Sequence, residues 1–213
     1  MKPQVPIEVD EATGVWTTDG LPMLYVPRHF FVNNHTAIEE ALGREKYAQL
    51  LYDAGYKSAY FWCASEAKTH GLSGLPVFEH YLKRLSQRGW GQFRFASADA
   101  KSGAAEIRLE NSLFVLAGGG AGSPAAASLA RPQAAGDMLA AGHVPAAGHV
   151  PAAGHVPAAG PAGGRCYMFA GWFAGAMDWV LETSGLRVKT HSGELQCGGQ
   201  GHNHCLFRVR PQS

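Results

Sequence analysis

The segment from residue 194 to residue 205 constrains the fold most, because it places a glutamate and two cysteines around a glycine-rich turn. It reads Glu194-Leu-Gln-Cys197-Gly-Gly-Gln-Gly-His-Asn-His-Cys205. Glycine adopts backbone angles that other residues avoid, so the chain can reverse tightly and aim both thiols at one point. A turn or bulge between Glu194 and Cys197 would bring the carboxylate beside the thiol. The segment therefore predicts a tight loop whose polar side chains converge.

A third sulfur is available from Cys166, which precedes a long apolar stretch. Three thiolates and one carboxylate form a closed four-coordinate set, which is typical of structural zinc. The site would be negatively charged, so we expect Arg165 or nearby backbone amides to compensate it. The spacing alone leaves alternatives open, because free cysteines are often small buried hydrophobic residues. His202 and His204 lie in the same loop, either as competing ligands or as solvated side chains.

Charge and length exclude several classes of protein. The 213 residues carry a net charge of +1, which gives no electrostatic reason to expect nucleic acid or an anionic membrane surface as a partner. Neither a signal peptide nor an apolar run long enough to span a bilayer is present. We therefore expect a cytoplasmic protein, in which reduced cysteines favour metal binding. The fourth cysteine, Cys63, lies on an apolar helix and is interpreted as a core residue.

Hydrophobic periodicity predicts an α+β fold in which an antiparallel sheet packs on helices. Thr36-Ala-Ile-Glu39 has the form of a capping box and predicts a helix start, with Gly43 ending that helix. The C-terminal helix and hairpin are expected to form a zinc-stabilised lobe. The predicted helices span 36–43, 44–70, 77–88 and 166–182. The predicted strands lie near 23–32 (an edge strand or an irregular hairpin, interrupted by Pro27), 93–95, 107–109, 113–116, 186–188 and 205–210.

Residues 117–164 differ from the rest of the chain. Ala-Ala-Gly-His-Val-Pro repeats three times from Ala140, within a stretch dominated by alanine, glycine and proline. Such a composition cannot bury enough apolar surface to offset the entropy of ordering, so we expect a disordered low-complexity insertion. The predicted organisation is a lead-in at 1–20 and a single domain at 21–210 that this insertion interrupts.

The C-terminal motifs resemble those of the 4-vinyl reductase domain family. The resemblance rests on Cys166-Tyr-Met-Phe-Ala-Gly-Trp-Phe-Ala-Gly-Ala, followed by Glu194-Leu-Gln-Cys197 and Cys205-Leu-Phe-Arg-Val. It implies an α+β fold related to vesicle-tethering subunits, and zinc ligands at Cys166, Glu194, Cys197 and Cys205. It also implies binding of small hydrophobic or aromatic molecules, as in the input domains of phenol- and xylene-responsive regulators. Unlike those regulators, the chain shows no ATPase phosphate-binding loop and no helix-turn-helix segment.

These observations favour non-catalytic binding of a small apolar or aromatic ligand, with a homodimer expected. The alternatives are an enzyme or accessory subunit that reduces or breaks down a small metabolite, such as a vinyl-bearing tetrapyrrole, and a dimerising scaffold. Aromatic side chains and one histidine are candidates for lining the ligand pocket, with ordinary core packing as the alternative. These candidates are Trp62, Phe78, His80, Tyr81, Trp90, Phe93, Phe169 and Trp172.

Overall fold

The computed structural model describes residues 5–117 and 164–212, and over these ranges the chain has the predicted α+β architecture. The predicted insertion at 117–164 lies outside the described residues except for its two end positions. Within the described ranges, no helix combines the length and apolar character needed to cross a membrane. The elements are β1 (Glu8–Asp10), β2 (Val15–Thr18), β3 (Leu21–Met23), α1 (Arg28–Leu42), α2 (Arg44–His70), α3 (Leu75–Gln87), β4 (Gln92–Asp99), β5 (Ala104–Glu110), α4 (Leu113–Ala117), α5 (Phe169–Thr183), β6 (Thr190–Gln196), the 3₁₀ turn η2 (Gly198–Gln200) and β7 (Cys205–Pro211).

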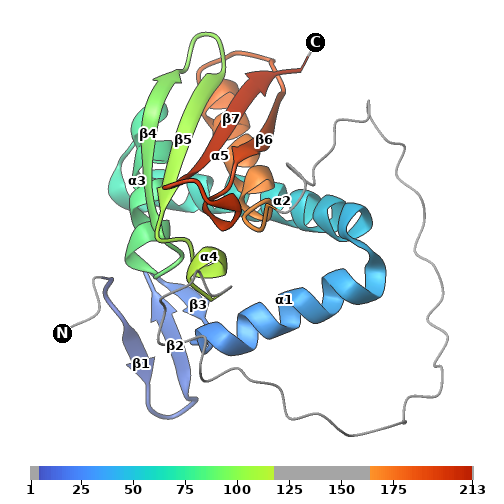
Figure 1. Cartoon of the computed structure of the whole chain (residues 1–213). Coiled ribbons are helices and arrows are strands. Elements are labelled where there is room, and N and C mark those ends of the chain that lie inside the picture. The colour runs from blue at the N-terminus through green and yellow to red at the C-terminus, as the bar shows by residue number, and fades with distance from the viewer. Residues whose placement is uncertain (1–4, 118–163, 213) are drawn as a thin grey trace, which may run out of the picture.

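The main sheet has four antiparallel strands in the order β4-β5-β7-β6, with helices α2, α3 and α5 behind it in Figure 1. Its period-two pattern places alternate residues of β5 and β7 in the core, as predicted. Ile107 pairs with Phe207, and Leu109 pairs with Cys205. Because β7 lies between β5 and β6, the C-terminal residues belong to the main sheet and do not form a separate lobe.

Helix α5 is the centre of the core, and its buried positions run all around the helix. It packs closely against α2 through two glycines. A Cβ atom at Gly171 would lie 2.1 Å from the carbonyl oxygen of Tyr52, and one at Gly175 would lie 2.3 Å from that of Tyr56. Only residues without a side chain permit this approach, so the two glycines set the distance between the helices.

The first helix begins earlier than predicted. Helix α1 starts at Arg28, directly after Pro27, so Thr36 lies inside the helix and the predicted capping box is wrong. The edge strand expected near 29–32 is therefore part of a helix. The ψ of Pro27 is 134°, an extended conformation from which the helix begins at the next residue. Gly43, with a φ of 77°, ends this helix as predicted.

Two other predicted strands are wrong. Residues 113–116 form the short helix α4, because a brief apolar run does not distinguish a buried helix from a buried strand. Residues 186–188 form no strand, and β6 begins only at Thr190. The prediction of a helix from Arg44 to about His70 is confirmed, and Gly71 ends it in a left-handed conformation.

Part of the predicted lead-in is ordered. Residues 8–10 and 15–18 form β1 and β2, which pair with β3 as an antiparallel three-stranded sheet. Figure 1 shows this small sheet beside the start of α1, away from the main sheet. The strands have mostly exposed residues, so hydrophobic alternation gave no signal for them.

Candidate metal centre

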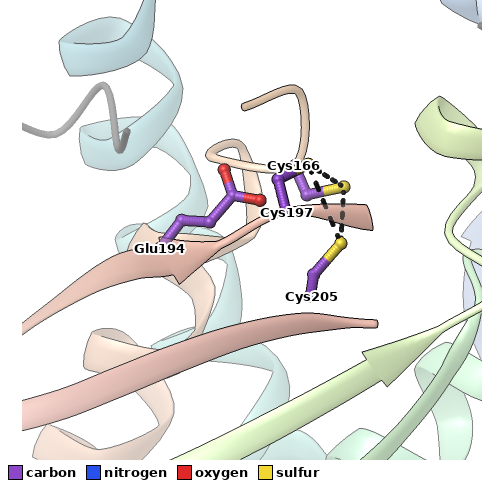
Figure 2. Close-up of side chains that lie close together, drawn as sticks. All are labelled: Cys166, Glu194, Cys197 and Cys205. Atoms are coloured by element: carbon purple, nitrogen blue, oxygen red, sulfur yellow. Dashed lines mark hydrogen bonds between the residues drawn. The ribbon is translucent and has the colours of Figure 1, made fainter. Parts of the chain in front are cut away.

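Four side chains converge from three parts of the fold. Cys166 lies three residues before α5, Glu194 lies in β6, Cys197 follows β6, and Cys205 is the first residue of β7. All four are buried, and their ligand atoms lie within 4.8 Å of one another. Figure 2 shows them facing a common point. The pairing register shifts between Glu194 and Gln196, which is the bulge expected beside Cys197.

The spacing of the sulfur atoms is compatible with a tetrahedral metal site. Cys166 Sγ lies 3.4 Å from Cys205 Sγ and 3.8 Å from Cys197 Sγ, and the latter two are 3.9 Å apart. Zn–S bonds of about 2.3 Å place the sulfurs of one tetrahedron about 3.8 Å apart. The three thiols are free rather than disulfide-bonded. The donor set therefore fits a divalent metal with a preference for sulfur.

Glu194 completes the set as a buried carboxylate. It is 4% exposed, and neither of its oxygens has a hydrogen-bond partner of normal geometry among the described residues. Burial, together with the adjacent Cys197 thiol, raises the pKa of this carboxyl to about 9. An unpaired buried carboxylate is costly, and a metal ion satisfies both its charge and its lone pairs.

Backbone amides surround the sulfurs. The amides of Arg165 and Gly199 donate to Cys197 Sγ at 3.3 and 3.4 Å, and the amide of Gly198 donates to Cys205 Sγ at 3.2 Å. Ser112 Oγ lies 3.0 Å from Cys166 Sγ. Such hydrogen bonds stabilise thiolates and orient metal ligands. The compensation expected from Arg165 or nearby amides thus comes from backbone N–H groups, while the Arg165 side chain is exposed.

The two loop histidines that could compete as metal ligands lie outside the four-residue cluster. His202 is exposed, and the His204 ring lies 3.0 Å from the side-chain amide nitrogen of Gln196. Neither histidine belongs to the four-residue cluster. Cys63 is fully buried in α2 and packs in the main hydrophobic core, as interpreted from the sequence.

The seven aromatic candidates for the ligand pocket belong to or pack against the main hydrophobic core, whereas His80 lies outside it and pairs with Glu66. Trp90, Phe93, Phe169 and Trp172 form one aromatic cluster with ring centroids 5.1–6.0 Å apart, mostly edge to face. Elsewhere, Trp62 packs on Tyr81 at 5.2 Å, and Phe78 packs on Phe95 at 5.0 Å. The first group is the more extensive aromatic surface.

Two surface hollows lie near these groups. One, of about 720 Å³, lies between α3 and β4 and is lined by Phe93 and His80 among others. The other, of about 390 Å³, lies between α1 and α4 and is lined by none of the eight predicted residues. It contains His35, Glu39 and Arg44, a polar set that the sequence pattern did not single out.

A buried aspartate also escaped the sequence analysis. Asp178 on α5 accepts hydrogen bonds from Tyr56 Oη at 2.6 Å and from the amide and hydroxyl of Thr190 at 2.8 and 2.7 Å. It ties α5 to α2 and to the start of β6, and thereby positions the helix that follows Cys166. The charge of Asp178 among mostly apolar residues of α5 is a sequence signal that a polar partner is needed, but it does not identify that partner.

Comparison with families gives one match. A family model described as a domain of unknown function, DUF5943, matches residues 1–96, a range that excludes the cysteine cluster. No curated protein matches the chain significantly.

Solved structures are similar to the chain to different degrees. The phenol-responsive sensory domain of the transcription activator PoxR, solved with phenol, is similar with a TM-score of 0.64 and 13% identity, covering 96% of this chain and 84% of that one. A trafficking protein particle complex subunit 3 from Naegleria fowleri, covalently bound to palmitic acid, has a TM-score of 0.47 and 10% identity over 87% and 95% of the two chains. A vinyl-4-reductase family protein from Methanocaldococcus jannaschii has a TM-score of 0.46 and 12% identity over 90% and 85%. The first similarity supports the fold expected from the 4-vinyl reductase resemblance.

Proposed function

We propose that this chain is a non-catalytic binding domain for a small apolar or aromatic molecule, stabilised by structural zinc and related to the 4-vinyl reductase domain family. The observation that carries the proposal is the convergence of three sulfurs and an unpaired buried carboxylate at one point. A cytoplasmic homodimer belongs to the same proposal.

The zinc ion would be held by Cys166, Glu194, Cys197 and Cys205. Four protein ligands leave no open position, which favours a structural role over a catalytic one. Bound there, the metal would join the segment before α5 to the C-terminal end of β6 and to the start of β7. This is the place where the chain needs a cross-link, because the loop from 198 to 204 has few buried residues.

The ligand proposal is supported by the aromatic cluster and by the fold. Small-molecule pockets are mostly apolar and contain a few polar groups. Phe93 belongs both to the aromatic cluster and to the hollow between α3 and β4, and His80 supplies a polar group at that hollow. We propose that the ligand enters through this hollow and contacts Trp90, Phe169 and Trp172. Trp62, Phe78 and Tyr81 stay predictions for the same pocket.

The zinc proposal predicts that Cys197→Ala loses the metal. Wild-type protein passed through a chelating buffer should retain one zinc per chain by elemental analysis, and the variant should retain none. Because metal binding is coupled to folding in such sites, the variant should also unfold at a markedly lower temperature.

Cys63→Ala is the matched control, since Cys63 is equally buried but lies outside the cluster. It should lose some stability through its cavity and keep its zinc. Zinc retained by Cys197→Ala would contradict the ligand assignment.

The ligand proposal predicts that phenol, used as the probe, changes the tryptophan fluorescence of the protein saturably. Trp90 and Trp172 lie in contact at 5.2 Å and would report a ligand between them and Phe93. Phe93→Ala should weaken the response, while Phe61→Ala, at an exposed position of α2, should leave it unchanged. Absence of binding across phenol and related aromatics, with no small molecule co-purifying by native mass spectrometry, would favour the scaffold alternative.

A further inference from the structure

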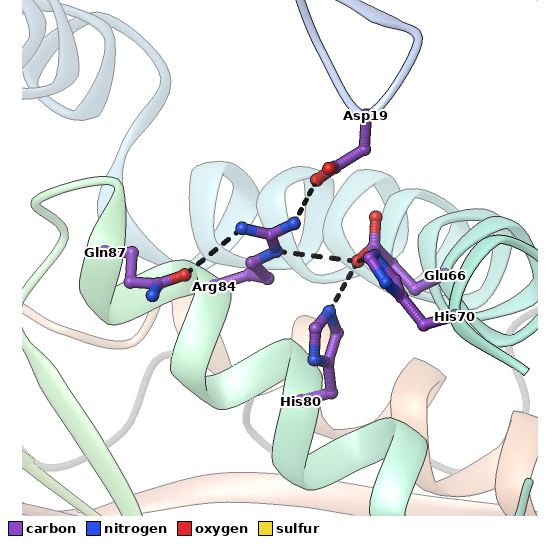
Figure 3. Close-up of polar contacts among 6 residues, drawn as sticks. All are labelled: Asp19, Glu66, His70, His80, Arg84 and Gln87. Atoms are coloured by element: carbon purple, nitrogen blue, oxygen red, sulfur yellow. Dashed lines mark hydrogen bonds and ion pairs between the residues drawn. The ribbon is translucent and has the colours of Figure 1, made fainter. Parts of the chain in front are cut away.

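A second group of metal-ligating side chains lies away from the cysteine cluster. Glu66 and His70 are four residues apart on α2 and therefore share one face of that helix, and His80 approaches from α3. His80 Nε2 lies 2.7 Å and His70 Nε2 lies 3.2 Å from the same oxygen, Glu66 Oε2. Figure 3 shows the two rings and the carboxylate meeting between the helices.

The carboxylate of Glu66 is deeply buried. The residue is 1% exposed, and its second oxygen, Oε1, has no hydrogen-bond partner among the described residues. Buried polar atoms are nearly always paired, so an unpaired carboxylate oxygen indicates a missing partner. The two histidine side chains are 31% and 19% exposed, which leaves a path from solvent to the cluster.

We propose that Glu66, His70 and His80 form a second divalent transition-metal site, with two imidazole nitrogens and one carboxylate as ligands. This combination suits zinc, cobalt, nickel or iron rather than calcium or magnesium. In a tetrahedral site with bonds of about 2.0–2.1 Å, neighbouring ligand atoms lie about 3.3 Å apart. The spacing to His70 already fits, and the His80 ring would move outward by about half an ångström. Solvent supplies the fourth ligand.

Arg84 forms an ion pair with the carboxylate. Its Nε lies 3.7 Å from Glu66 Oε2, its Nη2 pairs with Asp19 Oδ2 at 2.5 Å, and its Nη1 donates to Gln87 Oε1 at 3.3 Å. Asp19 balances the guanidinium charge, so Arg84 can orient Glu66 without repelling a cation as strongly as an unpaired arginine would. Partners of this kind, one shell outside the metal, fix the orientation of the ligands.

This site is independent of the proposed zinc centre. It uses nitrogen and oxygen ligands from α2 and α3, whereas the other centre uses sulfur from the segments around α5, β6 and β7. The two sites therefore differ in their spectra. Cobalt bound to thiolates gives intense charge-transfer bands in the near ultraviolet, and cobalt bound to imidazole and carboxylate gives only weak visible bands.

The test is a titration of the full chain with Co²⁺, followed by calorimetry and absorption spectroscopy. The parent protein carries His143→Gln, His149→Gln and His155→Gln, so that the repeat histidines contribute no metal ligands to the titration. With the cysteine centre loaded with zinc beforehand, we expect the parent to bind one equivalent of Co²⁺ with weak visible bands and without thiolate bands. His70→Ala, at a partly exposed position, should weaken that binding by at least about tenfold.

Glu66→Gln is the second variant, since it keeps the shape of the side chain and removes the ligand charge. His29→Ala, an exposed histidine on α1, is the matched control and should bind like the parent. The proposal is overturned if the parent shows no cobalt with nitrogen and oxygen ligands. It is equally overturned if His70→Ala and Glu66→Gln both titrate like the parent.

Discussion

At the scale of single residues, the burial of His35 makes the stability of the fold depend on pH. It is 6% exposed, its ring lies 4.6 Å from Phe114 and 5.1 Å from Tyr47, and its Nδ1 has no hydrogen-bond partner among the described residues. Burial lowers the pKa of this histidine; Glu39 opposes that shift and Arg44 adds to it. In the unfolded chain His35 therefore takes up a proton near pH 6.5, whereas in the folded chain it does so only at a lower pH.

We predict that the free energy of unfolding falls as the pH drops below about 6.5, and that His35→Phe makes this fall shallower. Since the folded pKa is depressed, the stabilising contribution is present above pH 6.5 and is lost at lower pH. Each pH unit between the two pKa values contributes at most about 1.4 kcal/mol. Urea unfolding at several pH values measures both slopes.

His202→Gln, at an exposed loop position, should keep the wild-type slope. Because the other titrating groups are the same in wild type and variant, the difference between the slopes isolates His35. Equal slopes for His35→Phe and wild type would show that the residue does not titrate with unfolding.

The sequence predicted the four convergent residues of the metal centre, but not the partners of those residues. Cys166, Glu194, Cys197 and Cys205 were identified by local spacing and by a family resemblance. Ser112 and Asp178 were not, because their hydrogen-bond partners Cys166, Tyr56 and Thr190 lie far away in the sequence. Such long-range pairs leave no local pattern, and only the fold reveals them.

At the scale of elements, the close contact between α2 and α5 determines how the core packs. In the interior of a helix, alanine is more stable than glycine by about 1 kcal/mol, so Gly175→Ala would stabilise an isolated helix. In this fold the added Cβ would lie 2.3 Å from the carbonyl oxygen of Tyr56, a backbone atom that cannot rotate away. We predict a net loss of about 1–3 kcal/mol, measured by chemical unfolding.

Gly193→Ala is the control, since a Cβ at that position meets nothing within 4 Å. It should change stability by much less than Gly175→Ala. A stabilised Gly175→Ala variant would show that the helices can separate at no cost, and that propensity outweighs packing there.

Helix and strand predictions succeeded where the pattern was long. The helix at 44–70 and the alternation of 205–210 were predictable because many residues repeat one period. The short helix α4 and the weak strands β1 and β2 were not, because a few residues do not establish a period. The start of α1 was misplaced because a capping motif at Thr36 also fits the middle of a helix.

At the scale of the whole molecule, the two described ranges meet at one turn. The Cγ atoms of Val115, near the end of the first range, lie 3.5 Å from the position of a Cβ at Gly198. Arg165 Cδ, near the start of the second range, lies 3.7 Å from that of a Cβ at Gly199. The described residues Val115 and Arg165, which flank residues 118–163, therefore both lie near η2, beside the metal centre, and a short connection can join the two ranges.

We predict that replacing residues 118–163 with a Gly/Ser linker of about eight residues, which reaches up to about 26 Å, preserves the fold and the zinc content. Shortening a connection of 46 residues to about eight removes about two and a half doublings of loop length, which should stabilise the protein by about 1.5 kcal/mol if the repeats make no packing contacts. Circular dichroism, elemental analysis and thermal unfolding of the two proteins measure these effects. A shortened protein that is insoluble, zinc-free or less stable would show that the repeat segment contributes contacts to the domain, and the metal centre at η2 is where those contacts would be sought first.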